Sequence, residues 1–316
     1  MNTYTKINTS YCRYQNITRD NCPNEKWLKW HNQIILGKFS DEVINYLKNC
    51  MFEGYEKIDG TNSKICFFPS TGDIRVGGKT DKASSMHGQF EMLQEIADRI
   101  QPKMCELFPK ESARFAPVKN KETNKVQYYI ASAEDTLDIK YFKEEEAISA
   151  LHMVKDPKFS SVEMEEVPIY IYGEYFGTGI QKCGGRYSDK NDFRVFDIDV
   201  QGWWIPKELR DKYCEELGLK QVPFLGYHTF LEFESMVKKG FKTTVDGVKD
   251  DTLMAEGIVA RPVIPIRDSR GNRIIVKIKS CDYNAYDQVM KEFTSEEFAQ
   301  FNMWYFENIE PKNDRY

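Results

Sequence analysis

The spacing of apolar residues predicts two helices in the first third of the chain. The first follows Ser40, which stands where an N-cap residue belongs and precedes two acidic residues of the first turn. The second covers residues 87–100 and ends before Pro102, because proline disfavours the interior of a helix. Its apolar residues recur three or four positions apart: Phe90, Leu93, Ile96, Ala97 and Ile100.

Two capping boxes predict further helices in the last third of the chain. Thr229 and Glu232 begin one of them, and Gly240 provides its stop signal. Thr294 and Glu297 begin the other, a short helix in the C-terminal tail. Three aromatic residues on one face of the tail helix favour burial. They are Phe298, Phe301 and Tyr305.

Short runs with alternating apolar and polar residues predict strands. The clearest runs cover residues 167–177, 193–200, 255–263 and 273–280. Strands and helices do not alternate regularly, so the pattern favours an α+β fold with antiparallel sheets over a doubly wound sheet. Residues 112–167 lack a clean period, and we interpret them as an insertion.

Charged residues lie on defined strand faces in three of these runs, one of which places Glu174 on the face of Tyr170 and Tyr172. Lys277 and Lys279 project from one face of their strand, while the opposite face is apolar with Ile274, Val276 and Ile278. Alternation places Glu256 on the apolar face of its own strand, beside Gly257, which permits close approach of a ligand or a backbone. Each charge taken alone is equally explained as a residue at the rim of a sheet.

Composition limits the class of protein. The 316 residues suffice for one large domain or two modest ones, and 41% apolar with 14% aromatic residues excludes a mainly disordered chain. A net charge of −5 argues against non-specific coating of nucleic acid but permits a local basic groove. The eight cysteines form no Cys-x-x-Cys pair, which indicates a reducing compartment and no zinc site. No run is long and apolar enough for a membrane span.

One lysine stands inside an apolar and aromatic run. The stretch "FEGYEKIDGTNSKICFF" places Lys57 two residues before Asp59 and Gly60. A lysine at a strand edge followed by an Asp-Gly turn explains this pattern. A nucleophilic lysine explains it as well, and the stretch alone does not decide between the two.

Six short motifs, in this order, resemble motifs I, Ia, III, IIIa, IV and V of the covalent nucleotidyltransferases. They are Glu56–Asn62, Gly77–Thr80, Tyr172–Phe176, Phe193–Ile198, Ala255–Val259 and Val276–Lys279. Within that superfamily the chain is most similar to the RNA ligase 2 group of bacteriophages and kinetoplastid RNA-editing ligases. The resemblance covers about residues 53–280 and implies an α+β, ATP-grasp-like ligase domain with antiparallel sheets, flanking helices and a short helical C-terminal tail. It implies an N-terminal extension over 1–50, the nucleotidyltransferase domain over 51–280 and the tail over 281–316.

The resemblance implies a role for each matching residue of motif I. Lys57 would become adenylylated, with Glu56 beside the adenine, Ile58 also contacting the nucleotide, and Asn62 near the ribose. The RNA ligase 2 group commonly has histidine where this chain has Asp59, as most other members of the superfamily do.

The later motifs supply the remaining implied contacts. Lys79 stands where motif Ia usually has arginine and would contact phosphate or the 3′-hydroxyl end, without the bidentate fork of arginine. Glu174 would bind the ribose, and Phe196 would stack on the adenine. Glu256 would act through a divalent metal. The motif V pair, Lys277 and Lys279, would hold the α-phosphate.

These residue types suit the implied chemistry. A lysine amine attacks phosphorus only when neutral, whereas a free lysine has a pKa of about 10.4. Neighbouring cations and burial both favour the neutral form. Cations also neutralise charge that develops on the phosphate.

The resemblance therefore predicts an ATP-dependent RNA ligase that uses Mg²⁺ or Mn²⁺ and joins 3′-hydroxyl and 5′-phosphate RNA ends through lysyl-AMP. The RNA ends are expected in a nicked duplex or held by a splint, and the protein is expected to be a monomer without membrane contact. A role in RNA repair, a phage or other viral source, and a cytoplasmic or host-cytoplasmic location are also expected.

Three alternatives stay open. A capping guanylyltransferase and a DNA ligase share these motifs, but both normally continue into an OB-fold domain, and 37 residues (316 − 279) follow Lys279. A catalytically silent nucleic-acid-binding relative would have no need of Lys57, Glu256 and both motif V lysines together.

Overall fold

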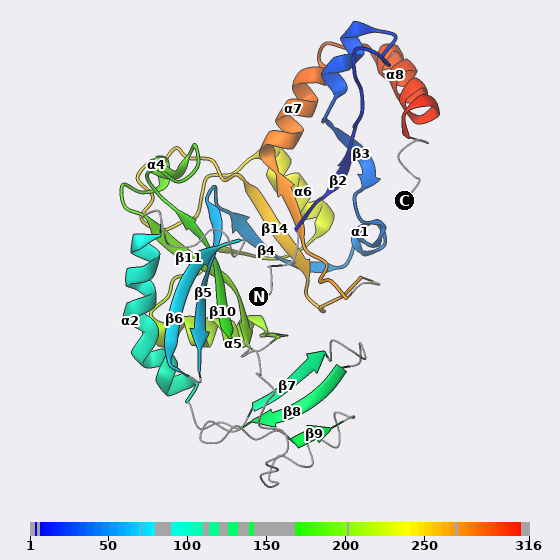
Figure 1. The fold of residues 1–316 in the computed structure, drawn as a ribbon. Helices are drawn as coiled ribbons and strands as arrows, with labels where there is room; N and C mark the ends of the chain where they lie inside the picture. Colours follow the sequence, from blue (N-terminus) through cyan, green and yellow to red (C-terminus); the bar gives the residue numbers. More distant parts are fainter. Residues whose placement is uncertain are drawn as a thin grey trace. The chain divides into compact units, whose positions relative to one another are not determined.

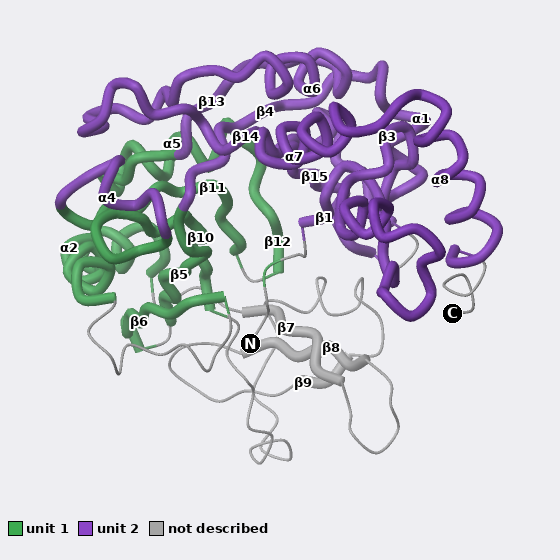
Figure 2. Tube along the Cα trace, turned by 90° about the horizontal axis from the view of Figure 1, so that it is seen from above, with its two compact units in different colours: residues 1–4, 60–181, 190–221 green, residues 5–59, 182–189, 222–316 purple. Residues whose placement is uncertain are grey.

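The computed structural model describes Tyr4 and residues 7–69, 71–79, 90–109, 168–200, 202–268 and 271–310, together with the backbone of three strands between 114 and 141. The chain divides into two compact units (Figure 2). Unit 1 comprises residues 1–4, 60–181 and 190–221, and unit 2 comprises residues 5–59, 182–189 and 222–316. Within the described residues, no helix is long and apolar enough to cross a membrane. The domain division expected from the motifs stays a prediction.

Unit 1 is built on a five-stranded antiparallel sheet (Figure 1). Its strand order is β12 (Trp203–Trp204), β11 (Asp192–Val200), β10 (Ile169–Phe176), β5 (Thr61–Phe68) and β6 (Asp73–Gly78). Two helices, α2 (Glu91–Leu107) and α5 (Lys207–Leu217), share one hydrophobic core with this sheet. Because side chains alternate along a strand, Asn62 and Lys64 of β5 and Glu174 of β10 project from the face opposite that core.

Helix α2 continues beyond its predicted end. The structure places Pro102 inside the helix, which ends at Leu107. Ile100 and Met104, on either side of the proline, are buried in the core of unit 1 at 2% and 0% exposure. Burial of these side chains outweighs the hydrogen bond that proline cannot donate. Similarly, the N-cap of α1 (Glu42–Leu47) is Asp41 and not Ser40, because the Asp41 carboxylate accepts from the backbone of Val43.

The region interpreted as an insertion contributes a separate three-stranded antiparallel sheet. Its strands are β7 (Arg114–Lys119), β8 (Val126–Ala131) and β9 (Ile139–Tyr141). The rest of the stretch 112–167 lies outside the described residues.

Unit 2 contains the second five-stranded sheet. Its order is β1 (Asn8–Thr9), β15 (Val276–Lys279), β14 (Gly257–Pro262), β4 (Met51–Lys57) and β13 (Phe224–Thr229), with β1 parallel to β15 and the other neighbours antiparallel. Helix α6 (Phe230–Lys239) packs on one face of it. Both predicted hydrogen bonds of the Thr229–Glu232 capping box are present. The antiparallel sheets and flanking helices of the two units confirm the α+β fold class.

The N-terminal segment and the C-terminal tail share a third hydrophobic cluster within unit 2. The segment contains β2 (Tyr11–Arg13), the 3₁₀-helix η1 (Glu25–Trp30) and β3 (Ile34–Phe39), and the tail contains α7 (Ser280–Met290) and α8 (Ser295–Asn308). The predicted capping box of α8 is present. Phe301 stacks on the fully buried Trp30 with ring centroids 5.4 Å apart. The aromatic face of the tail helix is therefore buried against the N-terminal segment.

We expect Phe301→Ala to lower the free energy of unfolding by about 3–5 kcal/mol, because the substitution leaves a cavity among aromatic rings. Met303→Ala on the same helix is the matched control, since Met303 is 61% exposed. Urea unfolding of the two variants measures the difference. Equal losses in both variants would show that the cluster does not stabilise unit 2.

Candidate active site

Three charged side chains meet at the ends of neighbouring strands in unit 2. Gly257 of β14 pairs with Lys57 on β4 and with Lys279 on β15, so the two lysines flank the start of β14. The Nζ of Lys57 lies 2.5 Å from Oε2 of Glu256, and the Nζ of Lys279 lies 2.7 Å from Oε1. Each oxygen of one carboxylate thus accepts a hydrogen bond from a different ammonium group.

The backbone around Gly257 explains how Glu256 reaches both lysines. Glu256 precedes the first residue of β14, so the alternation of the strand does not extend to it. The prediction that Glu256 shares the apolar face of Ile258 is therefore wrong. A Cβ atom on Gly257 would lie 2.0 Å from the carbonyl oxygen of Ile278, so the close approach that this glycine permits is that of a backbone.

The three side chains are largely shielded from water. Lys57 is 20% exposed, Glu256 18% and Lys279 26%. Burial by itself lowers the pKa of Lys279, but its hydrogen bond to Glu256 and the nearby negative charges raise that pKa above the ordinary value. Lys279 therefore keeps its positive charge at neutral pH, in contact with the carboxylate that also holds Lys57.

A short segment from elsewhere in the sequence fixes the turn after Lys57. The carboxylate of Asp59 accepts a hydrogen bond from the backbone N–H of Cys183 at 3.2 Å, and the hydroxyl of Tyr187 accepts one from the backbone of Asp59 at 3.5 Å. Burial raises the pKa of Tyr187, so its phenol stays protonated at neutral pH. The local sequence gives no signal for these contacts, because they join residues more than 120 positions apart.

Glu56 lies on the opposite face of β4 from Lys57. Its carboxylate accepts hydrogen bonds from the backbone and hydroxyl of Thr244, at 2.6 and 2.7 Å, and from the hydroxyl of Thr243. The side chain is buried at 2% exposure, and Ile58 is equally buried. Glu56 therefore anchors the segment that carries the two threonines, which the sequence did not suggest, and its contact with a nucleotide stays a prediction.

In unit 1, Asn62 and Glu174 are direct cross-strand partners on β5 and β10. The side-chain oxygen of Asn62 is shielded from solvent and has no hydrogen-bond partner among the described residues. Buried polar atoms normally have a partner, so this oxygen is available to a bound hydroxyl or amine. Lys79 lies exposed just after the end of β6.

Phe196 occupies a bulge in β11. Tyr172 pairs with Asp197 and Gly173 pairs with Val195, which leaves Phe196 as the extra residue of the strand. Its neighbours Val195 and Asp197 are buried at 0% and 1% exposure, whereas Phe196 is partly exposed. Bulges re-aim side chains and are frequent beside functional sites, and stacking of the Phe196 ring on a base stays a prediction.

A model of the RNA ligase family matches residues 52–279 of the chain. This range contains the lysine pair, the shared carboxylate and the bulged phenylalanine. The chain belongs to the RNA ligase family. No curated protein matches it significantly.

Solved structures of the Naegleria gruberi RNA ligase resemble this RNA ligase family member. The structure with PPi has a TM-score of 0.44 and 17% identity, and the match covers 80% of this chain and 55% of that one. A mutant with ATP and Mn has a TM-score of 0.45 and 15% identity, with coverages of 92% and 64%. The chain thus spans less than two thirds of the length of these solved chains.

The structure groups the implied site residues of this RNA ligase family member by unit. Lys57 and Lys279 each contact Glu256 in unit 2, and Lys277 projects from the same face of β15 as Lys279. Asn62 and Glu174 pair in unit 1, which also contains Lys79 and Phe196. Their roles toward a nucleotide stay predictions.

Proposed function

We propose that this chain is an ATP-dependent RNA ligase that joins 3′-hydroxyl and 5′-phosphate RNA ends through an adenylate on Lys57. The observation that carries the proposal is the carboxylate of Glu256 shared by Lys57 and Lys279. Transfer of a nucleotide to lysine needs positive charge beside the lysine, to stabilise the negative charge that develops on the phosphate. Lys279 supplies such a charge.

The proposed reaction has three steps. Neutral Lys57 attacks the α-phosphorus of ATP and loses a proton, a phosphoramidate bond forms, and pyrophosphate leaves. The 5′-phosphate of an RNA end then attacks the lysyl-AMP, so that AMP is transferred and Lys57 is released. Finally, a 3′-hydroxyl attacks the activated phosphate, loses its proton, and AMP leaves. Lys277 and Lys279 are proposed to hold the phosphate that reacts in each step.

The residues fit a divalent metal held mainly by the substrate. Among the described residues, no three His, Cys, Asp or Glu side chains converge as a metal site. Mg²⁺ is commonly bound by one or two carboxylates together with phosphates of the substrate, and Glu256 is a carboxylate of this kind. A metal there would neutralise charge on the phosphates.

The test is covalent labelling with α-labelled ATP and, separately, α-labelled GTP. We expect label from ATP to remain on the protein after denaturation and then to pass to 5′-phosphorylated RNA. Stronger labelling by GTP would identify a capping guanylyltransferase, and transfer to DNA ends alone would identify a DNA ligase. Absence of labelling with both nucleotides would identify a catalytically silent relative.

We also propose that this activity serves RNA repair in the cytoplasm, or in the host cytoplasm if the source is viral, with the protein acting as a monomer. Nicked duplex, splinted ends and a broken single strand are the three substrates to compare. Preferential joining of the first two would support repair of paired RNA.

A further inference from the structure

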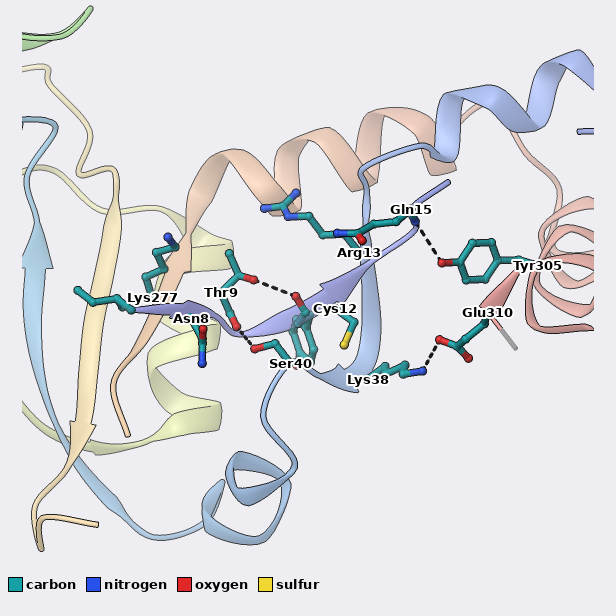
Figure 3. Close-up of a pocket in the computed structure, with 12 residues that line it drawn as sticks. Asn8, Thr9, Cys12, Arg13, Gln15, Lys38, Ser40, Lys277, Tyr305 and Glu310 are labelled. Atoms are coloured by element: carbon teal, nitrogen blue, oxygen red, sulfur yellow. Dashed lines mark hydrogen bonds and ion pairs between the residues drawn. The ribbon is translucent and has the colours of Figure 1, made fainter. Parts of the chain in front are cut away.

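A groove of about 450 Å³ lies along the N-terminal segment of unit 2 (Figure 3). The chain from Ile7 to Gln15 forms much of its lining, which extends from Lys277 at one end to Tyr305 and Glu310 at the other. The hydroxyl of Tyr305 accepts a hydrogen bond from the backbone of Gln15 at 3.1 Å, so the C-terminal tail is bonded to the N-terminal segment beside the groove. Lys277 is the one residue of this lining that also belongs to the implied site residues.

The groove begins at the strand that carries the motif V lysines. Thr9 pairs with Lys277 in the parallel β1–β15 ladder, and the backbone of Ser10 donates a hydrogen bond to the carbonyl of Lys277 at 3.2 Å. Lys279, two residues farther along β15, contacts the carboxylate that holds Lys57. The N-terminal strand therefore continues the surface of the candidate active site within the same unit.

The charges along the groove suit a phosphate backbone. Three lining residues are cationic, Arg13, Lys38 and Lys277, and one is acidic, Glu310. Arg13 also pairs with Asp282 at 2.7 Å, and Lys38 pairs with Glu310. The Lys38 side chain is 40% exposed, compared with 19% for Glu310, so the lysine is the more accessible member of its pair.

The other lining groups distinguish between classes of ligand. Hydroxyl and amide side chains of Asn8, Thr9, Gln15 and Ser40 line the groove and offer hydrogen bonds to sugar and phosphate oxygens. A docked protein helix would need a row of apolar anchors, whereas Ile7 is the one aliphatic residue in this lining. The volume falls within the range of about 300–1,000 Å³ that is usual for small-ligand sites, which favours a nucleotide unit over a folded partner.

We propose that this groove binds the sugar–phosphate backbone of the RNA strand next to the reacting end. This inference rests on the proposed function, and it gives the N-terminal segment a direct part in holding the substrate. When RNA binds, Lys38 contacts a phosphate and gives up part of its ion pair with Glu310. Glu310 opposes RNA binding through its negative charge.

The experiment compares Lys38→Gln with Glu310→Gln in the full-length protein. We expect Lys38→Gln to weaken binding of a short 5′-phosphorylated RNA about threefold to tenfold at low salt and to reduce the salt slope by about one. Glu310→Gln should instead tighten binding. Both substitutions break the same ion pair, so a purely structural effect would change affinity in the same direction.

Lys29→Gln provides the matched control. Lys29 is 50% exposed and pairs with Glu292 of the tail region, but it does not line the groove. RNA affinity of this variant should equal that of the unaltered protein. Equal weakening by Lys29→Gln and Lys38→Gln, or changes of the same sign in Lys38→Gln and Glu310→Gln, would overturn the proposal.

Adenylate formation separates failure of this inference from failure of the proposed function. The ion pair of Lys38 with Glu310 is separate from the ion pairs that Glu256 forms, so both variants should label with ATP at the unaltered rate. If both variants label normally but do not change RNA affinity in opposite directions, only the proposal that the groove binds RNA is overturned. If the unaltered protein fails to label, the proposed ligase function is overturned. The RNA-binding measurements then still test whether the groove binds RNA.

Discussion

Lys57→Arg should abolish formation of the protein adenylate. The guanidinium can still pair with Glu256, so the arrangement of charges around Lys279 is kept, but arginine stays protonated and cannot attack phosphorus. Labelling with α-labelled ATP, followed by denaturing electrophoresis, measures the loss. Lys57→Ala should give the same result by removing the amine altogether.

Joining of chemically pre-adenylylated RNA tests whether these variants keep an intact site. The last step of the proposed reaction does not use the lysine as a nucleophile, so Lys57→Arg should still join such RNA to a 3′-hydroxyl end. Lys48→Arg, a substitution on the same unit at the C-cap of α1, where the side chain bonds to Asn45, should label normally. Persistent labelling of Lys57→Arg would contradict the assignment of Lys57 as the covalent residue.

Local sequence signals predicted the parts of the fold that depend on neighbouring residues. The capping boxes at Thr229 and Thr294 begin helices because each box needs only residues three positions apart. The alternation around Lys277 and Lys279 likewise predicted which face of β15 is polar, since Val276 and Ile278 are buried. These features are encoded within single turns or single strands.

Features that depend on distant contacts were not predicted. The continuation of α2 through Pro102 reflects burial of Met104 in the core of unit 1. The bulge at Phe196 appears only when β11 is paired with β10. Stacking of Phe301 on Trp30 joins the two ends of the sequence, and no periodicity within either segment specifies its partner.

For the candidate site, the sequence predicted the charged residues but not the hydrogen bonds that position them. The resemblance named Lys57, Glu256 and Lys279 together, and the register of β4, β14 and β15 brings their side chains into contact. Neither the hydrogen bonds of Glu56 to Thr243 and Thr244 nor those that fix the Asp59 turn were predicted. Thr243 and Thr244 lie in a loop, whereas Cys183 is the N-cap and Tyr187 the last residue of the short helix α4 (Gly184–Tyr187), and no local pattern links either segment to β4.

Glu256→Gln should slow adenylate formation by about 10²–10³-fold, the usual cost of removing one preorganised electrostatic group from an active site. Glutamine keeps the shape of the side chain but removes the negative charge that holds Lys57 and Lys279 in place. It also removes the carboxylate proposed to hold a divalent metal. We therefore expect the Mg²⁺ or Mn²⁺ concentration needed for half-maximal labelling to rise.

Glu53→Gln is the matched control for this loss of charge. Glu53 projects from the same face of β4 as Lys57, four residues earlier, and forms an ion pair with Arg261. Glu53→Gln removes the same charge from the same sheet without changing a partner of either lysine. The labelling rate and metal requirement of this variant should therefore stay within about twofold of those of the unaltered protein. Equal losses in both variants would assign the effect to the sheet as a whole. A Glu256→Gln variant that labels at the normal rate would exclude this carboxylate from the chemistry, whereas a slow variant with an unchanged metal requirement would limit Glu256 to positioning the two lysines.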